Sequence, residues 1–370
     1  MFDAETWAKV PFHFWSLAMF VLGCIVGSFL NVCIYRMPIG KSIVSPPSYC
    51  PHCGYSIPFY LNVPLITWIT LRGKCANCGA SISIRYLLVE LLTGLAFLAC
   101  WLFYGRQAPA LALAYSVVMG GLIVATFIDL AHFIIPDEIT IGGMILGLLS
   151  SLAVPALHNQ AGSRAKGLIA SFIGLVVGGV LVEAVRQGGK LAFGRLKLAF
   201  ADNTKIFFGE TGVILPDREI PYDEIFYRKS DAIRFHARHL ELADRCFLNA
   251  EVALSPLKLK INEEEFDPEQ NLFMEAVTDQ MVLPREAMGF GDVKFMAAIG
   301  AFLGWQATVF SLVVSSFIGA IVGGTLILLK RHERANPIPY GPYIAVAAAL
   351  WIFAGERMMS WFWRIIAGPL

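Results

Sequence analysis

The sequence predicts an all-α polytopic membrane protein with about eight transmembrane helices and one polar insert. Hydrophobic residues make up 56% of the chain and charged residues 15%, against about 45–50% and about 25% in soluble domains. Of the 28 acidic residues, 18 lie within residues 188–286. Because carboxylates are costly inside a bilayer, this segment is interpreted as an insert between two membrane parts.

This composition argues against a disordered chain, a disulfide-stapled secreted module and an ordinary cytosolic enzyme. The net charge of +1 provides no global field for steering toward nucleic acid. The expected partner is therefore the lipid bilayer, and no nucleic acid is expected.

Apolar runs of span length set the number of helices, since a span needs about 20 apolar residues. The longest run, 295–329, would make a single helix about 52 Å long, so it is split at Gly304-Trp305-Gln306. The runs are 10–35, 91–105 (extended by 86–89), 107–128, 139–157, 167–182, 295–329 and 335–355.

The basic residues orient these spans by the positive-inside rule. With eight spans and the N-terminus outside, loops 36–86 and 330–340 are cytoplasmic. If the run 295–329 were a single helix, loop 330–340 would lie outside. The cytoplasmic loops carry Arg36, Lys41, Arg72, Lys74, Arg85, Lys330, Arg331 and Arg334, whereas the opposite loops carry Arg106, Arg164 and Lys166.

The chain is accordingly divided into five parts. They are a first transmembrane helix at 10–35, a cytoplasmic loop at 36–86, helices two to five at 86–187, a cytoplasmic insert at 188–286, and helices six to eight at 287–370.

The first loop contains two Cys-x-x-Cys-Gly knuckles. Their four thiols suit a tetrahedral structural Zn²⁺ site, which makes the loop zinc-ribbon-like. A reducing cytoplasmic location argues against disulfides, while a redox pair or a chance pattern remains the alternative. His52 is interpreted as a knuckle residue. The expected ligands are Cys50, Cys53, Cys75 and Cys78.

Two carboxylates lie at the edges of apolar segments. Asp129 follows twenty-odd apolar residues, and Asp292 follows Gly289 and Gly291 directly before an apolar run. Both are expected at the cytoplasmic face, where two close carboxylates can share a proton and activate water against a peptide bond. For Asp137, after Pro136, capping of the next helix is the competing explanation.

Several motifs together resemble the type IV prepilin peptidases, which are polytopic GxGD-type aspartic proteases of bacterial inner membranes. The resemblance covers essentially the whole chain except the insert. The motifs are Gly27-Ser-Phe-Leu-Asn31 through Arg36-Met-Pro38, the paired Cys-x-x-Cys, Arg85-Tyr86 through Glu90, Ile128-Asp129 with Pro136-Asp137, Gly289-Phe-Gly291-Asp292-Val-Lys294 and Pro339-Tyr-Gly341-Pro342.

The resemblance implies cleavage of the basic leader from type IV prepilins and pseudopilins, which serve pili or type II secretion. It also implies methylation of the new N-terminus with S-adenosylmethionine, because the four-cysteine loop accompanies bifunctional members. No single residue is assigned to methyl transfer. The implied catalytic residues are Asp129 and Asp292, with Gly289, Gly291, Lys294 and Asp137 as supporting motif residues.

Other functions fit parts of the sequence. A GxGD protease of the presenilin kind would lack methylation, and a transporter or zinc-sensing scaffold would use midplane carboxylates, which the apolar spans do not offer.

Short strand-like segments such as 205–208 and 211–216 predict a small β-rich insert of structural or regulatory value. A sharper hypothesis is that acidic residues of the insert capture the basic leader.

Overall fold

The computed structural model describes residues 11–160, 162–226, 229, 231–268, 273–284, 288–329 and 338–367. Lys330, Arg331 and Arg334, which carry part of the orientation argument, lie outside the described residues, as do residues 285–287 before the Gly-x-Gly-Asp motif. The chain forms two compact units. One comprises Met1–Glu183 and Phe290–Leu370, and the other comprises Ala184–Gly289.

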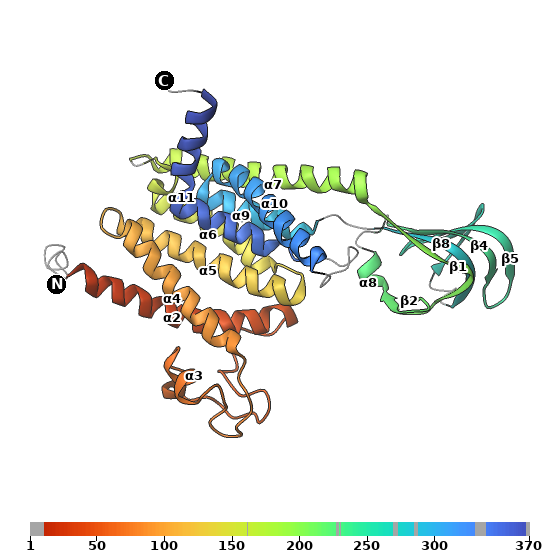
Figure 1. Cartoon of the computed structure of the whole chain (residues 1–370), viewed down its shortest axis with the longest axis horizontal. Helices are drawn as coiled ribbons and strands as arrows, with labels where there is room; N and C mark the ends of the chain where they lie inside the picture. Colours follow the sequence, from red (N-terminus) through yellow and green to blue (C-terminus); the bar gives the residue numbers. More distant parts are fainter. Residues whose placement is uncertain are drawn as a thin grey trace. The chain divides into compact units, whose positions relative to one another are not determined.

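The first unit is a bundle of apolar helices (Figure 1). Among the described residues, α2, α4, α5, α7 and α10 are long and apolar enough to cross a membrane. The protein is therefore a mostly helical, multi-pass membrane protein. The helices are α2 (Phe12–Arg36), α4 (Ile84–Tyr104), α5 (Pro109–His132), α6 (Asp137–Ala153), α7 (Arg164–Phe193), α9 (Phe290–Leu303), α10 (Trp305–Leu328) and α11 (Gly341–Ala367).

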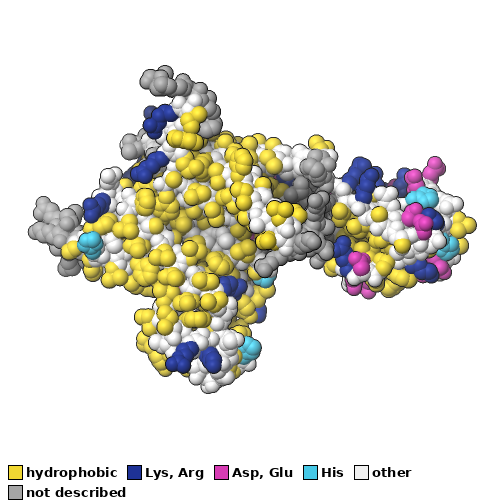
Figure 2. All heavy atoms as spheres, in the orientation of Figure 1, with side chains coloured by type: hydrophobic (Ala, Val, Ile, Leu, Met, Phe, Trp, Pro, Cys, Tyr) yellow, Lys and Arg dark blue, Asp and Glu magenta, His cyan; other side chains and the backbone are white. Residues whose placement is uncertain are grey.

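The surface of the helical unit is itself apolar. Side chains such as Leu17, Val180 and Phe317 are exposed by 63%, 63% and 67%. On the face that Figure 2 shows, hydrophobic side chains cover most of this unit, and the acidic side chains in view lie on the insert. Large apolar side chains in such numbers on an outer face are expected where lipid replaces water.

The longest apolar run is divided where the sequence predicts. Helix α9 ends at Leu303 and α10 begins at Trp305, and Gly304 between them has a φ of +82°, a conformation that favours glycine. Helices α6 and α9 have 17 and 14 residues, which is shorter than a full span. The eight-span topology therefore stays a prediction, while five candidate spans are found.

Glycines bring α2 and α4 into close contact. A Cβ on Gly27 would lie 2.7 Å from the Cα of Glu90, and one on Gly94 would lie 2.5 Å from Sγ of Cys24. On the neighbouring face of α2, Leu30 belongs to a buried cluster with Ile123 of α5 and other apolar residues. Helix α2 is therefore fixed between α4 and α5.

The loop between α2 and α4 has little regular structure. It contains the 3-10 turns η1 (Met37–Ile39) and η2 (Phe59–Leu61) and the short helix α3 (Ile66–Thr70). Two isolated β-bridges, Tyr49 with Ser56 and Lys74 with Ser81, close its two knuckles.

The insert is β-rich, as the sequence predicts. One eight-stranded antiparallel sheet, visible as a curved sheet in Figure 1, runs in the order β3-β2-β1-β8-β4-β5-β6-β7 around a buried apolar core. Its elements are β1 (Arg195–Phe208), β2 (Gly212–Ile214), β3 (Glu219–Pro221), α8 (Tyr222–Ile225), β4 (Ile233–Glu241), β5 (Cys246–Leu254), β6 (Leu259–Ile261), β7 (Glu264–Phe266) and β8 (Met274–Pro284).

Charges of both signs mix on the insert. Residues 188–286 carry 18 acidic and 13 basic side chains, a net charge of −5. Several acids are ion-paired: Glu275 lies 2.7 Å from Lys205, Glu265 lies 2.8 Å from Lys258, and Asp279 lies 3.2 Å from the guanidinium of Arg238. These pairs reduce the negative charge that would be available to a basic leader.

Candidate functional site

Asp129 lies in the last turn of α5 and is only 5% exposed. Its Oδ2 atom accepts a hydrogen bond of 2.9 Å from the backbone N–H of Gly341, at the start of α11. A carboxylate is disfavoured at a helix C-terminus and favoured at an N-terminus, where backbone N–H groups are free to donate. The start of α11 therefore compensates for the position of Asp129 at the end of α5.

Gly341 is needed for this contact. A Cβ at this position would lie 2.7 Å from Oδ2 of Asp129, which is closer than a carbon and an oxygen can approach without displacement. The Pro-Tyr-Gly-Pro motif of the sequence includes Gly341, but the contact of this glycine with Asp129 is visible only in the structure. A signal was present in the sequence: a glycine directly before a proline at a helix start indicates an unusual backbone requirement.

Asp292 lies in the first turn of α9 and is 8% exposed. The preceding residue, Gly291, packs against Ile135, with its ideal Cβ position 3.5 Å from that residue's Cβ. Ile135 also lies against Gly341, whose ideal Cβ position is 3.1 Å from Cδ1 of Ile135. The same isoleucine thus connects the Gly-x-Gly-Asp turn with the glycine that binds Asp129.

Helices α6 and α9 run side by side in the same direction. Lys294 and Asp137 form an ion pair of 2.6 Å near the two helix starts, and further along, the ideal Cβ of Gly147 lies 2.7 Å from the Cβ of Ala301. Because α6 follows closely after α5, its start is the end of the unit at which Asp129 lies. The structure therefore places Asp129 and Asp292 at the same end of the helical unit.

Asp137 does not cap α6, so the capping expectation is wrong. Pro136 occupies the cap position, no side chain makes a cap hydrogen bond there, and Asp137 is the first helical residue. Its carboxylate instead reaches Lys294. Helix α5 ends at His132, and Phe133 after it has a left-handed conformation.

The four predicted cysteines meet in one cluster. The Sγ atoms of Cys50, Cys53, Cys75 and Cys78 all lie within 4.8 Å of one another, and those of Cys50 and Cys78 are 3.9 Å apart. Zn–S bonds of about 2.3 Å in a tetrahedron separate the sulfurs by about 3.8 Å. The donor set therefore fits Zn²⁺, and the exposed His52 lies outside the cluster.

Each knuckle directs backbone N–H groups at its sulfurs. The N–H groups of Cys78 and Asn77 lower the pKa of the Cys75 thiol to about 6, and the N–H of Tyr55 together with the Asn77 amide lowers that of Cys53. Such hydrogen bonds favour the thiolate form that binds metal. The arrangement is suited to a metal centre.

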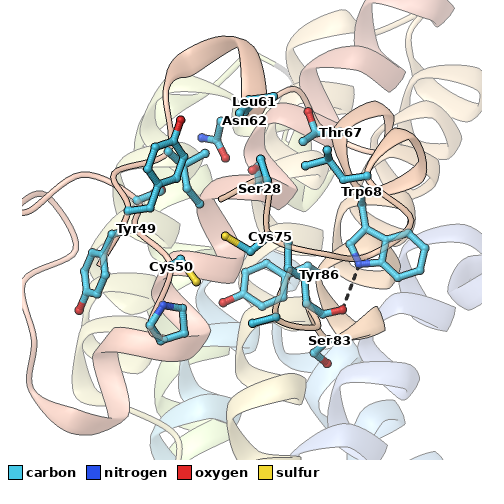
Figure 3. Close-up of a pocket in the computed structure, with 18 of the residues that line it drawn as sticks. Ser28, Tyr49, Cys50, Leu61, Asn62, Thr67, Trp68, Cys75, Ser83 and Tyr86 are labelled. Atoms are coloured by element: carbon cyan, nitrogen blue, oxygen red, sulfur yellow. Dashed lines mark hydrogen bonds between the residues drawn. The ribbon is translucent and has the colours of Figure 1, made fainter. Parts of the chain in front are cut away.

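A cavity of about 390 Å³ lies between this loop and helices α2 and α4. Figure 3 shows Tyr49, Trp68 and Tyr86 around it, with Ser28 of α2 and Cys75 of the metal cluster between them. Trp68 is held by a hydrogen bond from its Nε1 to the carbonyl of Ile82. Sequence reasoning did not identify this cavity.

The fold and these sites define a multi-pass membrane protein with two buried acidic residues at one end of its helices and a separate four-thiol loop. Residues 21–104 match the family described as Bacterial Peptidase A24 N-terminal domain, and residues 271–324 match the Type IV leader peptidase family. The chain belongs to the type IV prepilin leader peptidase/N-methyltransferase family.

Relatives extend this match over nearly the whole chain. The prepilin leader peptidase/N-methyltransferase of Aeromonas hydrophila is 28% identical over 95% of both chains. That of Pseudomonas aeruginosa is 27% identical over 92% of this chain and 91% of its own. The corresponding protein of Myxococcus xanthus is 46% identical over 40% of this chain and 44% of its own. No solved structure matches the chain significantly.

Proposed function

We propose that this protein removes the basic leader from type IV prepilins and pseudopilins and then methylates the new N-terminus. The observation that carries the proposal is the placement of Asp129 and Asp292 at one end of the helical unit, both buried, in a chain whose relatives are prepilin leader peptidase/N-methyltransferases. The expected location is the bacterial inner membrane, with cleavage on the cytoplasmic side.

In the peptidase step, the two carboxyl groups have different roles. An ionised aspartate takes a proton from water, and a protonated aspartate polarises the carbonyl of the scissile peptide. The hydroxide equivalent adds to the carbonyl carbon. The C–N bond then breaks, and the leaving amine takes the proton that the first aspartate received from water. The N–H of Gly341 on Oδ2 of Asp129 would hold that carboxylate in a fixed orientation.

Zn²⁺ would be held by Cys50, Cys53, Cys75 and Cys78 and would have a structural role. Four thiolates fill a tetrahedral shell, so no coordination position is left for water or substrate. The metal would stabilise a loop that has few regular elements of its own.

The methylation step needs a donor, for which S-adenosylmethionine is proposed. The new N-terminal amine must lose a proton and attack the methyl carbon; the N–C bond forms as the C–S bond breaks, and sulfur keeps the bonding electron pair. The protein must therefore bind a cationic sulfonium close to a neutral amine.

The decisive assay incubates the purified protein with a prepilin and S-adenosylmethionine and determines the product N-terminus by mass spectrometry. We expect a shortened and methylated pilin. Asp129→Asn and Asp292→Asn are each expected to lower the cleavage rate by about 10²–10⁴-fold, while Glu138→Gln, a change at an exposed acid near the same end, is expected to have little effect.

Other results of these experiments would indicate a different function or a different mechanism. Cleavage without methylation would indicate a GxGD protease with one activity. Substantial cleavage by either asparagine variant would refute the two-aspartate mechanism. Proton- or metal-dependent flux into liposomes in the absence of proteolysis would favour a transporter.

A further inference from the structure

The methyl donor sets clear requirements for a binding site. S-adenosylmethionine combines a flat purine, a ribose, a sulfonium cation and an amino-acid end with an amine and a carboxylate. A site for it needs aromatic faces, an acceptor of positive charge and a donor to the carboxylate, in a cavity of small-molecule size. The cavity of about 390 Å³ beside the metal cluster falls within the usual range of about 300–1,000 Å³.

The cavity has aromatic walls on three sides. Tyr49 comes from the first knuckle, Trp68 from α3 and Tyr86 from α4, and Figure 3 shows them around the same space. Aromatic faces stack against purines and attract onium cations through their π-electrons.

A buried carboxylate lies in the wall formed by α4. Glu90 is 8% exposed and lines the cavity, and its Oε2 accepts a hydrogen bond of 2.8 Å from the N–H of Leu65. Leu65 has a φ of +61°, which is strained for a side chain of this kind and is common at binding sites. A buried carboxyl group needs polar partners or a nearby cation, and the donor carries two cationic groups.

An arginine on the same wall has a hydrogen-bond donor atom without a partner among the described residues. Arg85 lines the cavity, and its buried Nε has no hydrogen-bond partner among the described residues. In contrast, Arg36 is occupied: its two terminal nitrogens donate to the carbonyls of Ser42 and Pro47. An unpaired buried donor is unfavourable, and a ligand carboxylate would satisfy it.

We propose that this cavity is the S-adenosylmethionine site, with Glu90 facing the cationic groups, Arg85 binding the carboxylate, and Tyr49, Trp68 and Tyr86 enclosing the purine and the sulfonium. The inference rests on the proposed methylation and locates it. It also gives the four-cysteine loop a function, because Cys50 and Cys75 line the same cavity and a bound metal would fix its wall.

Helix α2 separates this site from Asp129. Ser28 and Val32 face the cavity, whereas Leu30, two residues away, faces α5: the ideal Cβ of Gly120 lies 3.9 Å from its Cδ1. Two residues correspond to about 200° around a helix, so the cavity and α5, which carries Asp129, lie on opposite faces of α2. Cleavage and methylation would therefore occur at two different places.

The test measures binding without turnover. Calorimetric titration of the purified full-length protein with S-adenosylmethionine and with S-adenosylhomocysteine, in the absence of prepilin, gives a Kd for each. Glu90→Gln removes the charge but keeps an acceptor for Leu65, and Arg85→Gln removes the guanidinium. Each is expected to weaken S-adenosylmethionine binding by about 10–100-fold. Arg72→Gln, at an exposed position of the same loop, is the matched control and should bind like the unaltered protein.

The outcomes distinguish this inference from the proposed function. Zinc content and the thermal unfolding midpoint verify that each variant is folded. Variants that keep the original Kd, in a protein that still methylates pilin, would overturn the cavity assignment and leave the function intact. A separate titration with prepilin adds a second outcome. A variant that binds prepilin more weakly but keeps its affinity for the donor would overturn the inference as well, by assigning the cavity to the substrate. An unaltered protein that neither binds the donor nor methylates would refute both.

Discussion

Gly341 permits a direct test of the environment of Asp129. In Gly341→Ala the new Cβ would lie 2.7 Å from Oδ2, whereas ordinary contacts begin at 3.4 Å. If the carboxylate and the backbone separate by this difference, roughly 0.7 Å, the hydrogen bond of 2.9 Å becomes longer than a hydrogen bond can be. A charge-assisted hydrogen bond contributes about 1.5–3 kcal/mol, so kcat for leader cleavage should fall by about 10–150-fold.

The assay follows cleavage of a purified prepilin over a range of concentrations, so that kcat and KM are obtained separately. KM should change little, because Gly341 is not expected to contact the leader. Gly121→Ala is the matched control, since a Cβ at that position on α5 would meet nothing within 4 Å. A Gly341→Ala protein that is folded and cleaves at the original kcat would show that the Gly341 hydrogen bond does not serve catalysis.

Three further changes test other features. Lys294→Met removes the partly exposed ion pair with Asp137, and unfolding experiments should show a loss of about 0–1 kcal/mol; a much larger loss would mean that the pair is a principal contact between α6 and α9. Cys78→Ser removes one of the four thiols, so the zinc content measured by elemental analysis should fall toward background. The rate of methylation should fall more than the rate of cleavage. An unchanged zinc content would disprove the metal centre. Replacing residues 197–282 by a two-residue turn is feasible because Arg195 pairs with Pro284 in the sheet. The KM for prepilin should stay the same, because several acidic residues of the insert are ion-paired. A tenfold rise in KM would instead support capture of the leader by the insert.

The helix pattern could be predicted where physical constraints are local. The division at Gly304 follows from length, since one helix of the whole run would exceed the bilayer, and from the charge balance across it. The knuckles were equally predictable: two cysteines separated by two residues and followed by glycine leave few backbone arrangements, and Gly54 and Gly79 both have a φ of +70°.

Long-range contacts could not be derived in this way. Asp129 and Gly341 are 212 residues apart, and no periodicity connects them. The partner of Asp137 was missed for a related reason: its position after proline offered a sufficient local explanation, whereas Lys294 lies 157 residues away. Glu90, in contrast, could have been recognised as a binding candidate, because a carboxylate within an apolar helix requires a partner.

The position of α2 between the cavity and α5 constrains how the two reactions can follow one another. A pilin N-terminus released at the proposed catalytic residue Asp129 would lie on one side of this helix, and the proposed methyl donor would lie on the other. Because Gly27 brings the backbones of α2 and α4 into contact, a peptide cannot pass between these helices without separating them. The new N-terminus would therefore travel around the end of α2 that carries Arg36, near the loop that Arg36 binds. On this view the loop guides the product between two sites, and changes that loosen it should lower methylation of pilin that has already been cleaved.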